Sequence, residues 1–284
     1  MVYPVATPAN AGDNGRKRPI GSLITMASRF AVLRPTVYAL ALVASLTASA
    51  VYAQQEPRLD VIYVPTPQQV VDRMLQLADV KQGDYMIDFG CGDGRMVVTA
   101  AKLGARGYGV DINPQRIKEA NENAAKAGVT DKVEFKIANL FEEDLSKANV
   151  MAMYLLTDIN LRLRPKILDT MKPGSRIVSH AFDMGDWKPE VHENVDGRNV
   201  YFWIVPAKVN GTWQVEGANK MKVTLDQKYQ FFTGKAELDG GKTMDITDGK
   251  LKGNEISFKI GGQTYTGKVD GNTISGANWK ASKA

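Results

Sequence analysis

The segment with the clearest chemical meaning is DFGCGDG at residues 88–94, which lies between an apolar, β-prone run and a helix-like stretch. Its glycines Gly90, Gly92 and Gly94 let the backbone turn sharply and approach a ligand without an intervening Cβ atom. The first amides of the following helix can bind a polar or anionic group of that ligand. The segment therefore predicts a nucleotide-type cofactor site at the end of a strand.

The spacing of these glycines argues against a dinucleotide. A dinucleotide site needs a third small residue, G-x-G-x-x-G or A, so that its helix and strand pack closely. Counted from Gly90 that position is Arg95, and counted from Gly92 it is Val97. The spacing G-x-G-x-G with Asp88 before it instead resembles the first motif of class I (seven-strand) S-adenosylmethionine-dependent methyltransferases. A glycine turn without a ligand is the remaining alternative.

Three further segments agree with this resemblance. Asp111 ends a predicted strand, where Rossmann-like sites place a carboxylate on the ribose hydroxyls. The resemblance implies that Asn139 bonds the adenine edge and that Leu140 packs on the ring. The YVPTP segment precedes an amphipathic helix, and we expect its Tyr63 and Thr66 at the cofactor site. Simple structural entry to the domain is the alternative for YVPTP.

The combination of YVPTP, DFGCGDGR and DIN resembles a narrower family. These are the lysine N-methyltransferases that modify the ATP synthase c-subunit and the adenine nucleotide translocase in mitochondria, with their bacterial relatives. The similarity runs from about Tyr63 to Pro189 and includes DWKP at 186–189. Many amino-group methyltransferases carry Asp/Asn-Pro-Pro-Tyr after the fourth strand, whereas this chain has YLLTDIN at 154–160. The difference argues against methylation of DNA adenine or glutamine.

The candidates for the methyl-acceptor site are Tyr154, Asp158 and His180, at the predicted ends of the fourth and fifth strands. Ligands of open α/β sheets bind at that edge, so we expect these side chains to be the catalytic residues. A structural role is the alternative, above all for the lone histidine. Methyl transfer from a sulfonium is a direct displacement, so the protein chiefly aligns the reactants and favours a neutral acceptor lysine. We expect Cys91 to pack inside the glycine turn.

No group of His, Cys and Asp residues has the spacing of a metal site, so we expect no metal. The elements that must position the site alternate between strand and helix. This alternation predicts an α/β fold with a parallel sheet and helices on both faces, and the resemblance implies that it is a Rossmann-like seven-strand methyltransferase sheet. The expected strands are 85–89, 107–111, 133–137, 150–156, 176–182 and 200–206, and the expected helices are 95–103, 114–127 and 161–171.

The pattern changes at about Ala207. Residues 210–284 contain 12 of the 26 glycines, and short alternating runs are separated by Gly-Gly and Asp-Gly turns. Such turns between β-prone runs are typical of hairpins. The region therefore predicts a small antiparallel all-β domain, either a barrel or a curled sheet. The methyltransferase domain is expected at 63–207, after a linker at 54–62.

The first 53 residues are typical of a leader. Their apolar stretch Val37–Ala53 is short and rich in Ser, Thr and Ala for a membrane span of ~20 strongly apolar residues. Val51 and Ala53 fit the small-x-small rule for cleavage before Gln54, which predicts export to the periplasm. An uncleaved anchor that leaves the enzyme facing the cytoplasm is the alternative. Translation from Met26 would give a leader of ordinary length.

The charge of the chain argues against a nucleic-acid partner. The net charge is +5, but five basic residues and one aspartate in the first 53 residues account for four of these charges. The remainder lacks the clustered basic face that nucleic-acid binding needs. The resemblance implies methyl transfer from S-adenosylmethionine to a lysine of a protein substrate, membrane-associated proteins included. A small-molecule methyltransferase and a catalytically silent envelope binding module are the alternatives.

Overall fold

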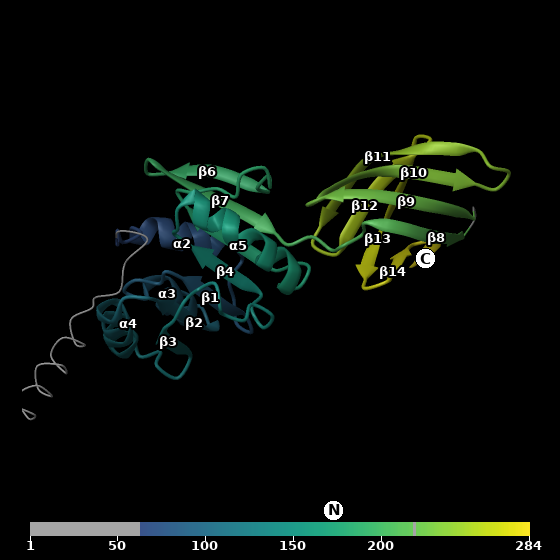
Figure 1. Cartoon of the computed structure of the whole chain (residues 1–284). Coiled ribbons are helices and arrows are strands. Elements are labelled where there is room, and N and C mark those ends of the chain that lie inside the picture. Colours follow the sequence, from purple (N-terminus) through teal and green to yellow (C-terminus); the bar gives the residue numbers. More distant parts are fainter. Residues whose placement is uncertain (1–62, 218–219) are drawn as a thin grey trace, which may run out of the picture. The chain divides into compact units, whose positions relative to one another are not determined.

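The computed structural model describes residues 63–217 and 220–284, which form a sheet domain followed by an all-β domain (Figure 1). Within this described part, no helix is long and apolar enough to cross a membrane. The leader expected at 1–53 and the linker expected at 54–62 lie outside the described residues.

The sheet domain contains seven strands in the order β3-β2-β1-β4-β5-β7-β6. Strands β1 to β5 run parallel, β7 pairs antiparallel with β5, and β6 forms a hairpin with β7. The expected seven-strand methyltransferase sheet is therefore confirmed. The strands are β1 (Tyr85–Phe89), β2 (Arg106–Asp111), β3 (Val133–Ile137), β4 (Val150–Met153), β5 (Arg176–His180), β6 (Val191–Val195) and β7 (Arg198–Ile204).

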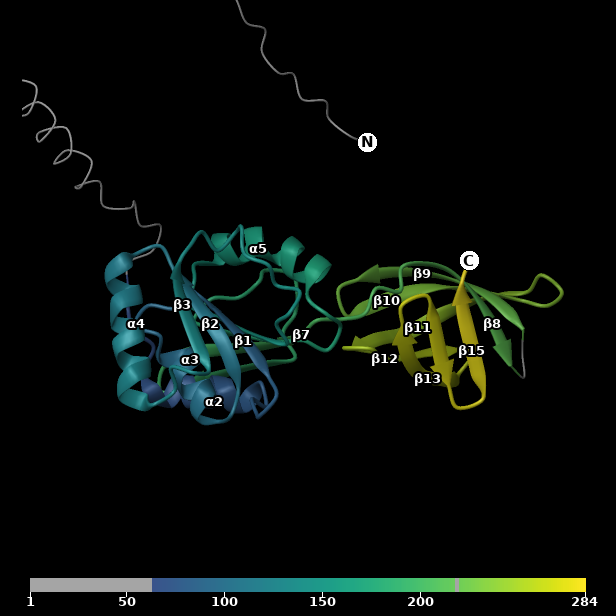
Figure 2. The same ribbon diagram turned by 90° about the horizontal axis from the view of Figure 1, so that it is seen from below.

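Helices cover both faces of this sheet (Figure 2). Alternate side chains of a strand point to opposite faces, so each buried strand contributes to two cores. On β4, Val150 and Ala152 pack in the core of α2 and α3, whereas Met151 and Met153 pack in the core of α5. The helices are α2 (Gln68–Leu77), α3 (Arg95–Lys102), α4 (Pro114–Ala127) and α5 (Thr157–Thr170).

The ends of α4 follow from local sequence. Asn113 is the N-cap, and its side-chain oxygen accepts a hydrogen bond of 2.9 Å from the Gln115 amide. Pro114 occupies the first helical position, where its missing N–H has no partner to lose. Gly128 ends the helix with a φ of 69°, in the left-handed region that favours glycine. These three residues place the ends of the helix that was expected at 114–127.

Several expected boundaries on the acceptor side were wrong. The fourth strand ends at Met153, and α5 begins at Thr157 instead of 161, because Leu156 adopts an extended N-cap conformation. The fifth strand ends at His180 because Ala181 turns the chain with a φ of 64°. These differences place residues 154–156 in a loop at the strand end.

The sheet also contains a strand that the sequence pattern missed. β6 reads VHENV, with side chains that alternate between partly buried and exposed, and therefore lacks the apolar run of a central strand. It lies at the edge of the sheet beside β7, which spans 198–204 and not the expected 200–206. The mixed sheet thus ends in an antiparallel hairpin instead of continuing parallel.

The second domain is a closed antiparallel barrel of eight strands. Its chain closes where β15 pairs with β8, and large apolar side chains that include Trp213, Phe258 and Trp279 fill its interior. The expected all-β domain is confirmed, and of the two expected forms it is the barrel. The strands are β8 (Gly211–Gly217), β9 (Met221–Lys228), β10 (Phe231–Leu238), β11 (Thr243–Lys252), β12 (Glu255–Ile260), β13 (Gln263–Asp270), β14 (Thr273–Gly276) and β15 (Trp279–Lys283).

Candidate active site

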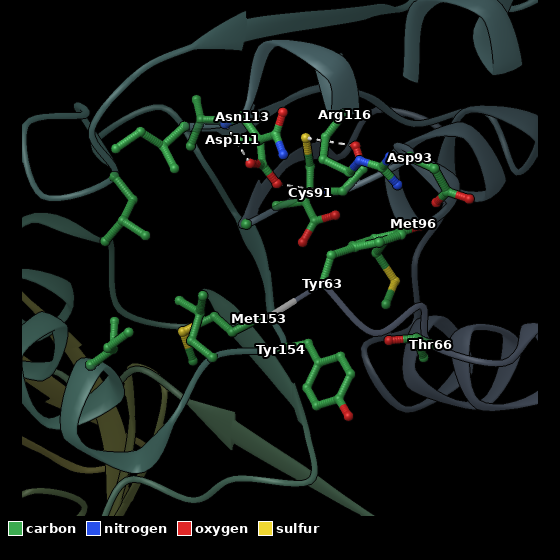
Figure 3. A pocket seen from close by; sticks show the side chains of 18 of the residues that line it. Tyr63, Thr66, Cys91, Asp93, Met96, Asp111, Asn113, Arg116, Met153 and Tyr154 are labelled. Atoms are coloured by element: carbon green, nitrogen blue, oxygen red, sulfur yellow. Dashed lines mark hydrogen bonds between the residues drawn. The ribbon is translucent and has the colours of Figure 1, made fainter. Parts of the chain in front are cut away.

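A pocket of about 490 Å³ opens at the carboxyl ends of β1, β2 and β4 (Figure 3). The strand order reverses between β1 and β4, and open α/β sheets bind their ligands at such a reversal. Eight of the nine predicted cofactor residues line the pocket, and Gly94 does not. Those eight are Tyr63, Thr66, Asp88, Gly90, Gly92, Asp111, Asn139 and Leu140.

The glycine turn is shaped by contacts on both sides. The Gly90 and Cys91 amides donate hydrogen bonds of 2.9 and 3.0 Å to the Val110 carbonyl oxygen. A Cβ atom on Gly92 would lie 2.3 Å from the Tyr63 ring, so this aromatic side chain rests directly on the backbone of the turn. Gly92 is therefore the position at which the backbone and the pocket wall must approach most closely.

Gly94 serves packing instead of the pocket. A Cβ atom there would lie 2.7 Å from Phe135 and 2.8 Å from Ala120, which come from β3 and α4. Cys91 lies beside it in the turn and is buried, and burial raises the pKa of its thiol far above the usual range. The packing of helices and strands around the turn thus accounts for Gly94 and Cys91 in the motif.

Asp111 joins the end of β2 to the glycine turn. Its carboxylate accepts hydrogen bonds from the Gly92 amide at 3.0 Å and from the Asn113 amide at 2.9 Å. These two bonds fix the orientation of a carboxylate that also lines the pocket. Asp111 is therefore held in place to accept hydrogen bonds from a ligand with its remaining lone pairs.

We expect Asp111→Ala to weaken S-adenosylmethionine binding by about 1.5–3 kcal/mol, the scale of a hydrogen bond to a charged group. Titration calorimetry measures this change. Asp111→Asn keeps the size of the side chain and one oxygen acceptor, so it retains one of the two bonds to the Gly92 and Asn113 amides and serves as a partial control for the shape of the turn. If the alanine variant binds as tightly as the parent protein, Asp111 does not contact the cofactor.

Asp88 is a buried carboxyl group on the floor of the pocket, only 6% exposed. Desolvation, followed by the charges of Asp111 and Asp93, raises the pKa of Asp88 to about 8. It forms no ion pair with any residue that the structure describes. A buried carboxylate without a cationic partner suits a ligand that brings positive charge or N–H donors.

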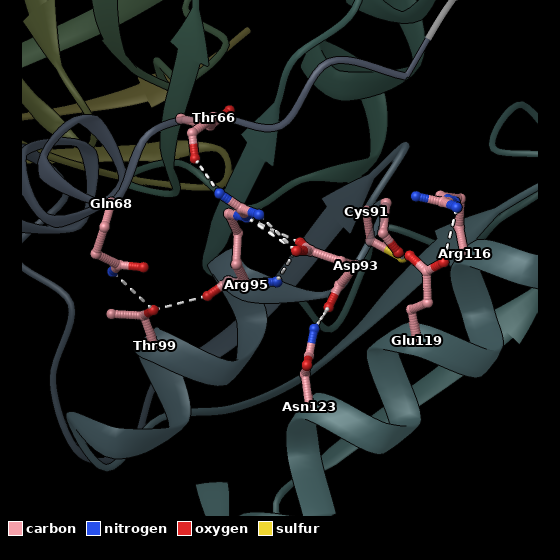
Figure 4. Close-up of polar contacts among 10 residues, drawn as sticks. Thr66, Gln68, Cys91, Asp93, Arg95, Thr99, Arg116, Glu119 and Asn123 are labelled. Atoms are coloured by element: carbon pink, nitrogen blue, oxygen red, sulfur yellow. Dashed lines mark hydrogen bonds and ion pairs between the residues drawn. The ribbon is translucent and has the colours of Figure 1, made fainter. Parts of the chain in front are cut away.

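The segment Tyr63–Pro67, here called the strap, is held against the glycine turn (Figure 4). The Arg95 guanidinium donates to the Thr66 carbonyl oxygen at 2.7 Å and pairs with Asp93 at 2.6 Å. The Arg116 guanidinium lies 4.4 Å from the centre of the Tyr63 ring. Desolvation is the main cause of the raised pKa of Tyr63. The strap thus forms a wall of the pocket, fixed by two arginines.

The other wall of the pocket is aromatic and aliphatic. Tyr154 follows β4 and lines the pocket, and Phe182 packs beside it with ring centroids 6.1 Å apart. His180 is buried behind Tyr154 and does not line the pocket. Asp158 is exposed in the first turn of α5 and does not line it either. The structure therefore brings only Tyr154 of the three acceptor candidates into the pocket, and their roles stay predictions.

Asn139 lines the pocket with a side chain that already has two partners. Its amide nitrogen donates to Glu142 at 3.0 Å, and its oxygen accepts from the Phe141 amide at 3.1 Å. Leu140 is partly buried next to it. The predicted contacts of Asn139 and Leu140 with adenine stay predictions, because these bonds also have a local role in the loop after β3.

Several pocket residues escaped the sequence reasoning. The glycine spacing did not point to Arg95 as a pocket residue, although the opposite charges of Asp93 and Arg95 on either side of Gly94 are a local signal of their ion pair. Arg116 and Phe182 carried no signal, because their nearness to the pocket depends on how α4 and the turn after β5 pack. Further lining residues of this kind are Val64, Met96, Ile112, Phe141, Leu156 and Ile159.

A chain ending near Ala207 should retain cofactor affinity within about threefold, because every lining residue of the pocket lies between Tyr63 and Phe182. The measurement is calorimetric titration of the shortened, soluble protein beside the full chain. A shortened protein that is folded by circular dichroism but fails to bind the cofactor would show that the barrel completes the site.

Three comparisons with known proteins agree with this geometry. The family model described as the ANTKMT methyltransferase domain matches residues 88–191. A protein of Saccharolobus islandicus (strain REY15A) named protein-lysine N-methyltransferase is 46% identical over 149 residues, which cover 50% of this chain and 92% of that protein. The human lysine N-methyltransferase named for the c-subunit of ATP synthase is 24% identical over 151 residues, which cover 51% of this chain and 64% of that protein.

A solved structure shares both sequence and fold. It is described as an RNA methyltransferase from Salinibacter ruber in complex with S-adenosyl-L-homocysteine, and it is 49% identical with a TM-score of 0.50. The match covers 51% of this chain and 96% of that chain. The glycine turn, the oriented carboxylate of Asp111 and the buried carboxyl group of Asp88 fit the polar and cationic groups of S-adenosylmethionine, which is the cofactor. The chain belongs to the family of S-adenosylmethionine-dependent methyltransferases that includes the Saccharolobus islandicus protein-lysine N-methyltransferase.

Proposed function

We propose that this protein transfers a methyl group from S-adenosylmethionine to a lysine amine of a protein substrate. Two relatives are named for lysine methylation, whereas the Salinibacter ruber structure is described as an RNA methyltransferase. The properties of this chain must therefore decide whether the acceptor is the amine of a lysine or RNA, which is a polyanion.

The charge around the site supports the lysine acceptor. Residues 63–206 contain 20 acidic and 18 basic residues, and the pocket is lined by three aspartates and two arginines. Both arginines have local partners, since Arg95 pairs with Asp93 and Arg116 with Glu119. RNA binding relies on basic groups that neutralise phosphates. A slightly acidic domain favours an approaching ammonium group over a nucleic acid.

The cofactor supplies an activated methyl group, and the chain binds and aligns the reactants. In this proposal Asp111 accepts hydrogen bonds from the ribose hydroxyls, and Asn139 and Leu140 contact adenine. The cationic part of the cofactor favours the ionised form of Asp88, which then offers it negative charge. Tyr63 and Thr66 close the pocket over the glycine turn. These roles rest on the position of each residue in the lining of the pocket.

The acceptor end of the pocket supports a neutral amine as the nucleophile. Tyr154, Phe182, Leu156 and Ile159 line this part, and none of them carries a charge. Desolvation disfavours the charged form of an amine and lowers its pKa. A lysine that enters between these side chains therefore loses its proton more readily than in water, and the Tyr154 ring can guide its approach.

Exposed apolar side chains at the mouth of the pocket support a protein substrate. Val64, Ile112 and Leu156 line the pocket and are 55, 43 and 37% exposed, and Ile137 at the end of β3 is 57% exposed. Apolar patches on a protein surface favour contact with another protein or with a membrane. This rim suits a lysine presented next to apolar residues, as on a membrane-associated protein.

The observation that carries the proposal is the combination of an acidic cofactor end with an uncharged acceptor end in one pocket. The test is incubation of the purified protein with cofactor labelled in the methyl group and with separate protein, RNA and small-molecule fractions of cells. We expect label in the protein fraction, and mass spectrometry should locate it on lysine. Label found only in RNA or in small molecules would reject the proposal.

We further propose that Val37–Ala53 directs export and that the mature protein begins near Gln54. The physical objection to export is the supply of cofactor. S-adenosylmethionine is made in the cytosol, and a charged molecule does not cross a bilayer unaided. A phosphatase fused after residue 60, combined with N-terminal sequencing, separates the cases. An active fusion with Gln54 at the N-terminus is expected. An inactive fusion with an intact N-terminus would instead favour an anchor that leaves the enzyme facing the cytoplasm.

A further inference from the structure

His180 lies behind the pocket wall, where it touches two separate parts of the site. It is 2% exposed, and its Nδ1 atom lies 3.0 Å from the Thr66 hydroxyl oxygen, within hydrogen-bond distance. Its ring packs on Tyr154, with ring centroids 3.9 Å apart and planes inclined by 39°. Thr66 belongs to the strap and Tyr154 to the acceptor wall, so a single imidazole bridges the two sides of the pocket.

The backbone after His180 also serves the acceptor wall. Ala181 holds a φ of 64°, a left-handed conformation that a residue with a side chain rarely adopts. The turn is fixed by the Phe182 amide, which donates to the His180 carbonyl oxygen at 2.8 Å, and by the Ser179 hydroxyl, which donates to the Phe182 carbonyl oxygen at 2.6 Å. This strained turn places Phe182 in the pocket lining beside Tyr154.

The environment of His180 argues against a role as a general base. Desolvation, with a smaller contribution from the charge of Arg198, lowers the pKa of His180 to about 4. The imidazole is therefore a weak base that stays neutral near pH 7. It is also absent from the lining of the pocket, so a proton of the acceptor has no direct route to it.

We propose that His180 is a positioning residue that fixes the strap and the acceptor wall relative to one another, through its bond to Thr66 and its contact with Tyr154. The strap is in turn tied to the glycine turn by the bond from Arg95 to the Thr66 carbonyl oxygen. The imidazole thus connects the part of the pocket that holds the cofactor with the part that aligns the methyl acceptor. This inference rests on the proposed transfer to an acceptor at Tyr154.

Paired variants separate the two contacts. His180→Phe keeps a ring against Tyr154 and removes the nitrogen that faces Thr66, whereas His180→Asn keeps a polar atom near the position of Nδ1 and removes the ring. Thr66→Val removes the hydroxyl from the other end of the same bond, and Thr66→Ser retains it. His192→Gln is the matched control, because the chain has two histidines and His192 lies exposed on β6, away from the pocket.

We expect His180→Phe and Thr66→Val each to lower kcat about tenfold and to change the cofactor Kd by no more than about threefold. A small misplacement of a reactant slows the transfer step more than it weakens binding. The double variant should lose no more than about tenfold, since both changes remove the same bond. Thr66→Ser keeps the hydroxyl, so it should retain at least about half of the kcat of the unaltered protein. A merely structural residue would lower the melting temperature without changing kcat per folded molecule.

Several results would overturn the inference: an unchanged kcat in the single variants, additive losses of about a hundredfold in the double variant, or a loss explained entirely by cofactor Kd. The kinetics use whichever acceptor the unaltered protein methylates, so failure of the lysine assignment is seen separately. A second readout needs no acceptor. In ¹⁵N NMR spectra of His192→Gln, the imidazole signal that remains is that of His180. Combining this variant with Thr66→Val should shift the signal, and an unchanged signal would also overturn the inference.

Discussion

Gly92→Val should abolish S-adenosylmethionine binding, with an affinity loss on the order of a hundredfold or more. A backbone conformation unsuited to a side chain costs ~1–3 kcal/mol, and the steric clash adds to this strain. A Cβ atom at Gly92 would lie 2.3 Å from the Tyr63 ring, and the backbone there has a φ of 52°. Tyr63 would have to leave its place under Arg116, and the strap would move with it. Calorimetric titration of the soluble variant measures the loss.

Gly83→Val is the matched control for this variant. Gly83 also has a positive φ, 92°, but a Cβ atom added there meets nothing within 4 Å. The control carries a comparable backbone strain without the steric clash, so it should lower the melting temperature and keep cofactor affinity. Equal loss of binding in both variants would show that strain in the fold, and not the approach of Tyr63 to the turn, governs the site.

Asp88→Asn should make the cofactor-free protein more stable and the cofactor complex weaker. The pKa of Asp88 is raised from its ordinary value of 3.8 to about 8, so the folded state keeps a proton that the unfolded state releases. The stability that comes from the protonated group is fully present below about pH 4 and is lost as the pH rises to about 8. Asparagine does not titrate, so the stability gain of the variant should grow across this range.

Thermal unfolding at pH 5 and pH 8 tests the stability of this variant. Each unit of pKa difference corresponds to about 1.4 kcal/mol, so the gain in melting temperature should be clearly larger at pH 8 than at pH 5. Cofactor affinity should fall by about 1.5–3 kcal/mol, as for the loss of a charged hydrogen-bond partner. A gain that is the same at both pH values would contradict a raised pKa at Asp88.

Asp144→Asn is the control of opposite sign. Hydrogen bonds from Ser146 lower the pKa of Asp144, which does not line the pocket. Its ionised form is favoured in the fold, so replacing it should bring no gain in stability at pH 8 and no change in cofactor binding. A gain at this position would point to a general effect of net charge on the protein.

The sequence by itself determined the elements whose signals are local. The glycine turn after β1, the carboxylate at the end of β2 and helix α4 were predicted because dihedral preference and strand and helix patterning act over a few residues. The seven-strand fold and the cofactor were expected because these segments resemble the motifs of a known family. The barrel was expected as an all-β domain because hairpin turns are also local.

Only the tertiary structure decided how residues far apart in the chain meet at the acceptor side. The bridge from Thr66 through His180 to Tyr154 spans 114 residues between its first two members, and no local pattern encodes that distance. Arg116 reaches Tyr63 because α4 packs beside the strap, and β15 reaches β8 because the strand register closes the barrel. Such contacts depend on how whole helices and strands pack. Burial of side chains from distant parts of the chain selects one arrangement among several that the local sequence allows equally. For that reason local sequence patterns pointed to eight residues that line the pocket, whereas the arrangement of the acceptor wall required the fold.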